Sequence, residues 1–270
     1  MLKESLLLAS FVFSQFVPAQ IVRLPAGSLY TRTTAYSRQF SDAFSFSANQ
    51  GALAEVGSFS AGVYSERRFL LNALSLYSAA VVLPTTSGNF GFKGDYFGEV
   101  SYNESAISLA YGRSVSSKLA VGLQFNYLAI KAAGYGAASA VNFDAGAIVH
   151  VTPQFNAGVH VYNPVQKGWG KNKDEFFPAT YSVGLGYDAS PQVFVGAEVD
   201  KTDHQPIGVN AGLHYKLAEQ FIARMGIRSA SVCYLGLGIR KNRLRIDVTA
   251  SLHPYLGLTP GLLLLFLPTE

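Results

Sequence analysis

The amino-acid sequence predicts an all-β protein, a closed antiparallel transmembrane β-barrel of about fourteen strands. Along most of the chain apolar residues alternate with small or polar ones, and this period of two is typical of strands with two different faces. Charged residues make up only 14% of the chain, against roughly 25% in a typical soluble domain. The first residues also have the features of an export signal.

Residues 1–19 are predicted to be a cleaved secretory signal peptide. One lysine lies in residues 1–4, an apolar stretch covers residues 5–17, and small or short residues place the cleavage after Ala19. The apolar stretch is too short for a membrane-spanning helix, which needs about 20 residues. A buried N-terminal helix is the alternative interpretation of these residues.

The alternation is clearest in residues 154–162, 192–200, 208–217 and 243–252. In residues 192–200, valines and an alanine at odd positions oppose Phe194, Gly196, Glu198 and Asp200. The predicted strands are 57–66, 72–83, 87–95, 103–113, 118–131, 139–151, 154–163, 179–188, 192–200, 207–217, 220–228, 231–240, 243–252 and 259–267. Most are long enough to cross a bilayer, since a tilted strand needs about 9–11 residues.

Alternation also occurs in soluble sandwiches and lipocalin-like barrels, so other features must place the barrel in a membrane. The polar face is rich in Gly, Ser, Asn and Ala rather than in Lys and Glu. Connections after even-numbered strands are short, whereas most of the others are longer, as in residues 94–102, 132–138 and 164–178. Short periplasmic turns, longer outer loops and an even strand count are typical of outer-membrane barrels. We therefore expect outer-membrane lipid around the barrel and a location in the outer membrane of a Gram-negative bacterium.

Three segments carry a resemblance to a known family: residues 41–54, residues 63–69 at the end of the first predicted strand, and residues 253–260 before the last. The chain resembles the PorV/PorQ-type barrels of Bacteroidetes, a branch of the long-chain fatty-acid transporter (FadL) family of outer-membrane proteins. Members of the family carry an Asn-Pro-Ala near the N-terminal segment, whereas here Asn49 is followed by Gln50 and Gly51.

The resemblance implies a short N-terminal plug segment that folds into the lumen. We assign residues 20–56 to it, because they precede the first strand and lack clean alternation, and a helix is possible over residues 41–56. The plug candidates are Asp42, Asn49, Gln50 and Glu55. A helix that caps the periplasmic end is the alternative. Residues 57–270 then form the barrel.

Charged residues on the polar faces of several strands are predicted to line the lumen. The lumen-lining candidates are Asp144, Glu198, Asp200, Arg224, Arg228, Arg240, Arg243 and Arg245. They could form a structural ion-pair network with each other and with the plug, or an arginine wall for a ligand carboxylate. Some of the arginines could instead lie at the membrane rims.

The outer loop over residues 164–178 mixes charged and aromatic residues, and its contact candidates are Lys167, Trp169 and Phe176. Such a composition suits either a contact surface or a solvated loop. The chain has one cysteine, Cys233, which we expect to be a packed apolar residue.

The sequence predicts a protein that is not an enzyme. It has no phosphate-binding loop, no nucleophile elbow and no clustered metal ligands, so no catalytic or metal residues and no cofactor are assigned. The net charge of +4 comes from scattered residues, which argues against nucleic-acid binding.

Two functions remain. As the resemblance implies, the chain could be a plugged barrel associated with type IX secretion, with other envelope or secretion proteins as partners. Alternatively, it could transport a small hydrophobic molecule across the outer membrane.

Overall fold

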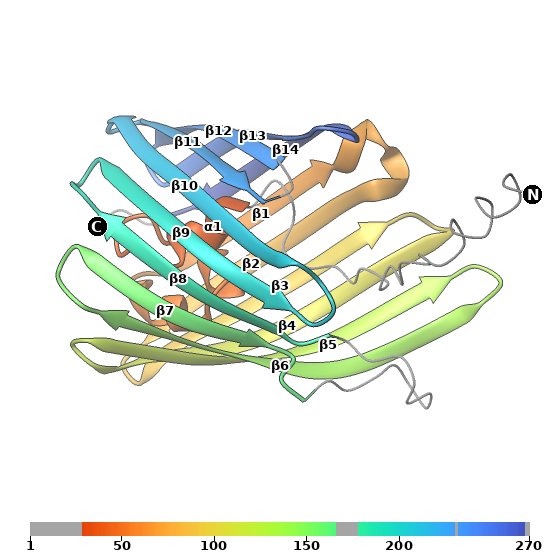
Figure 1. The fold of residues 1–270 in the computed structure, drawn as a ribbon, viewed down its shortest axis with the longest axis horizontal. Coiled ribbons are helices and arrows are strands. Elements are labelled where there is room, and N and C mark those ends of the chain that lie inside the picture. Colours follow the sequence, from red (N-terminus) through yellow and green to blue (C-terminus); the bar gives the residue numbers. More distant parts are fainter. Residues whose placement is uncertain (1–28, 166–177, 230–231, 268–270) are drawn as a thin grey trace, which may run out of the picture.

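The computed structural model describes residues 29–165, 178–229 and 232–267. These residues form fourteen antiparallel strands in a closed barrel, in which each strand pairs with its neighbours in sequence and β1 closes on β14 (Figure 1). The strands are β1 (Ser60–Arg67), β2 (Ser75–Thr85), β3 (Gly88–Gly98), β4 (Tyr102–Ser116), β5 (Leu119–Ala132), β6 (Gly136–His150), β7 (Phe155–Tyr162), β8 (Thr180–Asp188), β9 (Val193–Thr202), β10 (Ile207–Ala218), β11 (Phe221–Arg228), β12 (Val232–Lys241), β13 (Leu244–His253) and β14 (Gly257–Phe266). The predicted fold class of a closed fourteen-stranded barrel is confirmed.

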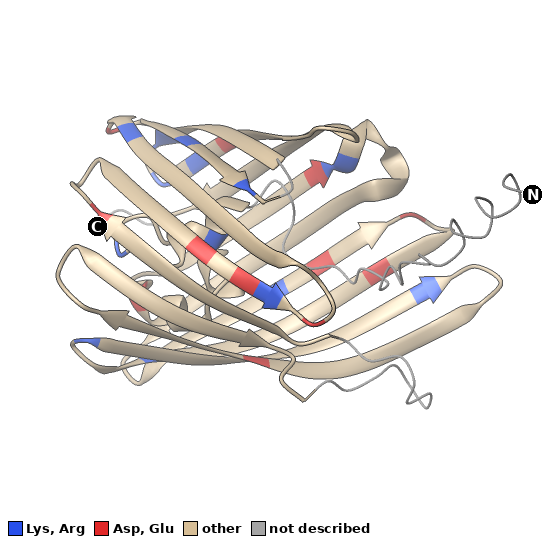
Figure 2. Ribbon diagram, in the orientation of Figure 1, with Lys and Arg blue, Asp and Glu red and all other residues tan. Residues whose placement is uncertain are grey.

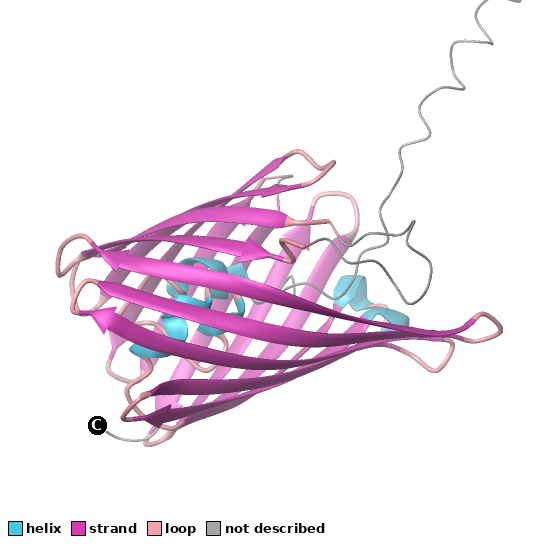
Figure 3. Cartoon of the chain, turned by 90° about the horizontal axis from the view of Figure 1, so that it is seen from below, coloured by secondary structure: helices cyan, strands magenta, loops and turns pink. Residues whose placement is uncertain are grey.

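Helices are few and short in the described part of the chain. They are α1 (Leu29–Thr34) and the 3-10 helices η2 (Ser45–Ser47), η3 (Gln50–Glu55), η4 (Arg68–Leu70) and η5 (Asn72–Leu74). The predicted helix over residues 41–56 is thus two short 3-10 turns. Figure 3 shows one group of helices inside the barrel and a second group at one end. No helix among the described residues is long and apolar enough to cross a bilayer.

Several connections after odd-numbered strands are shorter than predicted. The predicted loops 94–102 and 132–138 shrink to residues 99–101 and 133–135, because strand pairing continues beyond the point where the alternation fades. Glycines with positive φ, such as Gly98 at 98°, close these turns without steric cost. The connection 163–179 is long, as predicted, whereas the connection 68–74, predicted to be short, is also long and contains η4 and η5.

Because the number of strands is even, the barrel sequence begins and ends at the same end of the barrel, which distinguishes the two ends. The turns 86–87, 117–118, 151–154, 189–192, 219–220 and 242–243 lie at the same end as Ser60 and Phe266, where the barrel sequence begins and ends. Outer-membrane barrels have their short turns in the periplasm. We therefore name this the periplasmic end, and the opposite end the outer end.

The outward face of the barrel is apolar around its circumference. Large hydrophobic side chains such as Val63, Phe125 and Leu237 are 52%, 60% and 68% exposed, and similar residues recur on every strand. Charged residues occupy only short parts of the strands (Figure 2). A belt of this kind is costly in water but favourable in lipid, while barrel closure satisfies the strand hydrogen bonds that lipid cannot.

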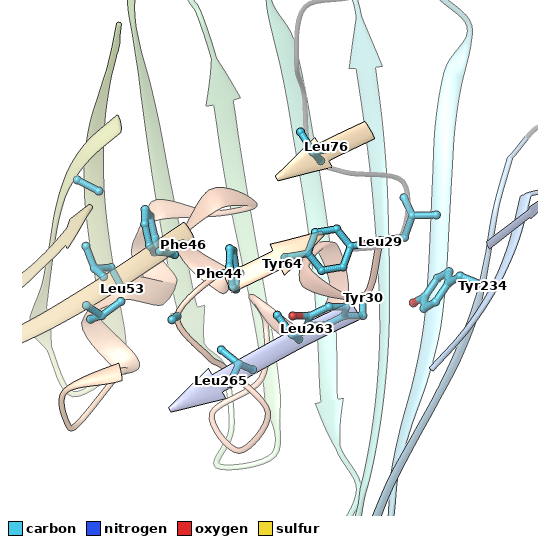
Figure 4. Packing of buried hydrophobic residues seen from close by; sticks show 14 residues of the cluster. Leu29, Tyr30, Phe44, Phe46, Leu53, Tyr64, Leu76, Tyr234, Leu263 and Leu265 are labelled. Atoms are coloured by element: carbon cyan, nitrogen blue, oxygen red, sulfur yellow. The ribbon is translucent and has the colours of Figure 1, made fainter. Parts of the chain in front are cut away.

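The inward face is not uniformly polar. On β14, Leu263 and Leu265 point into the barrel, where they join Tyr64 of the adjacent β1 and Leu76 of β2. Side chains of residues 29–53 pack against this apolar strip and its surroundings. Figure 4 shows Phe44 beside Tyr64 and Leu265, with Phe46 and Leu53 farther along the wall. The hydrophobic core of the protein is therefore the contact between the N-terminal residues and the wall.

Candidate functional site

Residues 29–56, which we call the N-terminal segment, lie inside the lumen. The wall makes room for them with glycines, since a Cβ atom added at these positions would meet the segment within or below van der Waals contact. At Gly112, for example, it would lie 2.8 Å from Leu53 Cβ, and at Gly158 it would lie 2.8 Å from Tyr36 Cε1. The wall glycines that contact the segment in this way are Gly62, Gly91, Gly112, Gly122, Gly146, Gly158, Gly184, Gly186, Gly196 and Gly212.

Asn49 joins the N-terminal segment to strands β6 and β7. Its side chain accepts a hydrogen bond from the backbone N–H of Gly51 (2.9 Å) and thereby caps the N-terminus of η3. Its amide also donates to the backbone carbonyls of Ala147 (3.3 Å) and Val159 (3.0 Å). One buried residue thus shapes the segment and holds it to the wall. The adjacent Gln50 is also fully buried and donates to the carbonyl of Phe46 at 3.2 Å.

A buried ion cluster fixes the N-terminal segment to β9. Arg32 of α1 donates to Glu198 (2.8 Å) and to Asp200 (3.1 Å), and the Tyr36 hydroxyl donates to the second oxygen of Glu198 (3.0 Å). Burial lowers the pKa of Arg32, but the two carboxylates raise it and the net direction is upward, so Arg32 stays charged. Burial and then Glu198 raise the pKa of Tyr36, which keeps its hydroxyl a donor.

A second cluster lies farther around the wall, on β11 and β13. Arg245 of β13 bonds to Asp42 of the N-terminal segment at 2.8 Å and lies 3.2 Å from Asp247. Arg224 of β11 pairs with Asp247, and its guanidinium lies 4.6 Å from the centre of the Tyr30 ring. These arginines are therefore bonded to carboxylates of the wall and of the segment.

Polar contacts continue to the periplasmic end. His150 Nε2 lies within hydrogen-bond distance of Glu55 Oε1, at 2.9 Å. The Ser37 hydroxyl donates to Asp188 at 2.6 Å. The segment thus contacts the wall from the level of α1 down to the periplasmic turns.

The structure separates the remaining predicted site residues. Arg228 is partly buried at the outer end of β11, 3.5 Å from Asp200. Arg243 was predicted to line the lumen, but it lies in the turn 242–243 and is exposed, because β13 begins one residue later. Arg240, also predicted to line the lumen, is half-buried near the same periplasmic turn and bonds to the Asn242 carbonyl at 3.4 Å. Lys167, Trp169 and Phe176 lie outside the described residues, as does the predicted signal peptide.

The outer half of the lumen contains a cavity of ≈ 80 Å³. Arg32, Ser47 and Ala48 form its floor, and its walls come from β3 to β9. Among the wall residues, Asp144 accepts hydrogen bonds from Gln124 (3.1 Å) and Asn126 (2.8 Å). The remaining lining residues are Lys93, Asp95, Ala106, Ser108, Leu128, His160, Tyr162, Thr180, Ser182 and Glu198.

Sequence reasoning missed Arg32, the short helix α1 that carries it, and Tyr36 just beyond the end of this helix. The inward glycines were visible in the sequence, but a glycine in a strand indicates close approach without saying what approaches. Cys233, expected to be packed, is exposed on the outer face of β12. Within the described ranges, no group of three or more His, Cys, Asp or Glu side chains is placed to hold a metal ion.

Comparisons with known proteins reveal similarity in fold. No protein-family model matches the chain, and no curated protein sequence matches it significantly. Among solved structures, the CymD monoaromatic hydrocarbon channel has a TM-score of 0.64 at 12% identity and covers 86% of this chain and 94% of its own. A Pseudomonas aeruginosa FadL homologue has a TM-score of 0.62 at 12% identity over 91% and 98% of the two chains. The Pseudomonas putida toluene transporter TodX has a TM-score of 0.61 at 10% identity over 92% and 98%.

The chain has the FadL-like outer-membrane barrel fold. The apolar belt, the closed sheet and the even strand number agree with this fold. It is the architecture of barrels in the outer membrane of Gram-negative bacteria, and the location predicted from the sequence agrees with it.

Proposed function

We propose that this chain is a plugged outer-membrane channel for the uptake of a small, mainly hydrophobic molecule. The observation that carries the proposal is the match, over most of both chains, to structures named as a monoaromatic hydrocarbon channel and a toluene transporter. Because one fold can host several functions, the proposal also needs a site, and the lumen cavity above the N-terminal segment supplies one.

The proposed route runs along the lumen, with the N-terminal segment as its plug. The wall beside the cavity is closed to a sideways exit at β3, the strand that carries Lys93 and Asp95. Hydrogen bonds close it on both sides, because β3 pairs with β2 over residues 88–97 and with β4 over residues 89–98. The segment packs against the inward glycines of the periplasmic half. A molecule in the cavity would therefore reach the periplasm only after the segment had moved.

The PorV/PorQ-like role in type IX secretion stays a prediction. Most of the outer loop that would serve as its contact surface lies outside the described residues. The names of the structures with similar folds support transport, and no contact among the described residues favours secretion over it.

An uptake assay separates these two roles. The chain would be produced in a Gram-negative host without a type IX system, and the initial uptake of radiolabelled toluene by intact cells would be compared with that of empty-vector cells. A channel raises the rate several-fold, whereas a barrel that only docks secretion proteins has no partner in this host. If the initial rate of toluene uptake does not increase although the folded barrel is demonstrated in the outer membrane, the proposal is contradicted.

A further inference from the structure

The structure points to a more specific cargo, and this inference rests on the proposed function. We propose that the lumen cavity recognises the hydroxyl group of a small neutral amphipathic molecule, such as an aromatic alcohol, rather than a plain hydrocarbon. The arrangement of apolar, polar and charged side chains around the cavity carries this proposal.

The cavity has an apolar side next to a polar side. Ala106, Leu128 and Ala140 face one another across β4, β5 and β6 and form a small buried cluster near the outer end. One step toward the periplasmic end, the row Ser108, Asn126 and Asn142 is linked by hydrogen bonds of 2.6 Å and 2.8 Å. A bound molecule would meet hydrocarbon on one side and hydrogen-bonding groups on the other.

Four residues that line the cavity each have one buried polar atom without a hydrogen-bond partner among the described residues: Arg32 Nε, Ser47 Oγ, Gln124 Oε1 and His160 Nε2. Arg32, Gln124 and His160 are only 8%, 5% and 8% exposed. A buried polar group without a partner costs about 1–3 kcal/mol, so such groups favour a ligand that satisfies them. Because a hydroxyl both donates and accepts, it can serve the Gln124 acceptor and one of the donors together.

The charged groups on the cavity are already bonded, which favours a neutral ligand. Arg32 is held by Glu198, and Lys93 Nζ lies 2.7 Å from Asp95. Asp144 accepts from the Gln124 and Asn126 amides. A carboxylate ligand would have to break one of these contacts, and breaking a buried ion pair is strongly unfavourable.

The size of the cavity suits a single ring. Because one water needs about 10–15 Å³ of such space, ≈ 80 Å³ holds roughly five to eight waters. A ligand that replaced them one heavy atom at a time would have about the size of benzyl alcohol.

The test compares toluene, benzyl alcohol and benzoate, which share a ring and differ in their polar group. Their binding to the purified full-length barrel in lipid nanodiscs would be measured calorimetrically, with titrations into empty nanodiscs subtracted. We expect benzyl alcohol to bind roughly three- to tenfold more tightly than toluene, as one net hydrogen bond provides, and benzoate to bind most weakly. Gln124→Leu and His160→Phe should each reduce the preference for benzyl alcohol, whereas Gln192→Leu, in an exposed turn, should leave it unchanged.

Each contrary result overturns a defined part of the inference. Equal binding of toluene and benzyl alcohol overturns hydroxyl recognition but leaves channel function intact. If benzoate binds most tightly, the inferred preference for a neutral ligand is overturned. If none of the three probes binds, the cavity is not the binding site. If Gln124→Leu or His160→Phe fails to fold, Ser47→Ala replaces it and should also lower the preference. Because these measurements use isolated barrel, they remain interpretable if the cell uptake assay fails.

Discussion

The two halves of the lumen are built on different principles. In the periplasmic half, glycines on the wall let the N-terminal segment pack against the strands, and Asp42 joins the segment to Arg245 of β13. The cluster of Arg32 with Glu198 and Asp200 of β9 lies where this half meets the outer one. In the outer half, side chains line a cavity, and several of their polar atoms have no partner among the described residues. The difference indicates that one half maintains the closed state while the other half is available to a ligand.

Loss of Arg32 should have the largest effect on stability, because this residue lies where the two halves meet. Arg32→Met leaves Glu198 and Asp200 buried without their cation. We expect the free energy of unfolding in urea to fall by about 3–5 kcal/mol. The control is Arg243→Met in the exposed turn, with an expected change within about 0.5 kcal/mol. Equal effects of the two substitutions would contradict a structural role for the cluster.

Filling the space left by one inward glycine should displace the N-terminal segment. At Gly184 an added side chain would overlap the Tyr36 ring, whereas at the outward-facing Gly94 it would meet open space. We expect Gly184→Leu to cost about 1–3 kcal/mol and to raise the conductance of the barrel in planar bilayers. Gly94→Leu should change neither property. If Gly184→Leu conducts no better than the unchanged protein, the segment tolerates the extra volume and is not held as described.

The smallest effect is expected from extra volume in the outer half. Leu128→Phe would extend into the cavity and should change stability by less than about 1 kcal/mol. Leu53→Phe, in the packed half beside Gly91 and Gly112, should cost about 1–3 kcal/mol. Urea unfolding of both variants measures the difference, and a reversed order would show that the cavity is not real free space.

The sequence predicted the barrel well because its signal repeats. Every strand carries the same alternation, and lipid outside with polar groups inside requires it over the whole circumference. The signal fades at strand ends, so outer connections such as 99–101 and 133–135 were predicted too long. It was ambiguous on β14, where both Leu262 and Leu263 are apolar although they face opposite sides.

The candidate site was predicted only in part, because partners far apart in sequence define it. Polar positions on the strands nominated Glu198, Asp200 and Arg245. Of their counterparts in the segment without periodicity, Asp42 was named as a plug candidate, but Arg32 was not. Arg243 was nominated wrongly for a different reason. The strand begins one residue later than predicted, and this shift moves the Arg243 side chain from the lumen to a turn. The cavity depends on unfilled space, for which a sequence has no direct signal.

The most direct test of the account locks the N-terminal segment to the wall. A Cβ atom at Gly51 would lie 3.2 Å from Ile148 Cγ1 of β6 and would overlap no atom at less than 3.0 Å, so Gly51→Cys and Ile148→Cys place two thiols within bonding distance while Asn49 keeps its hydrogen bonds. With Cys233→Ser to remove the exposed native thiol, uptake of labelled toluene would be measured in intact cells before and after reduction. The account predicts uptake at the empty-vector level while the disulfide is intact and recovery once it is reduced. Equal uptake in both states, with the disulfide verified by mass spectrometry, would contradict a plug that must move.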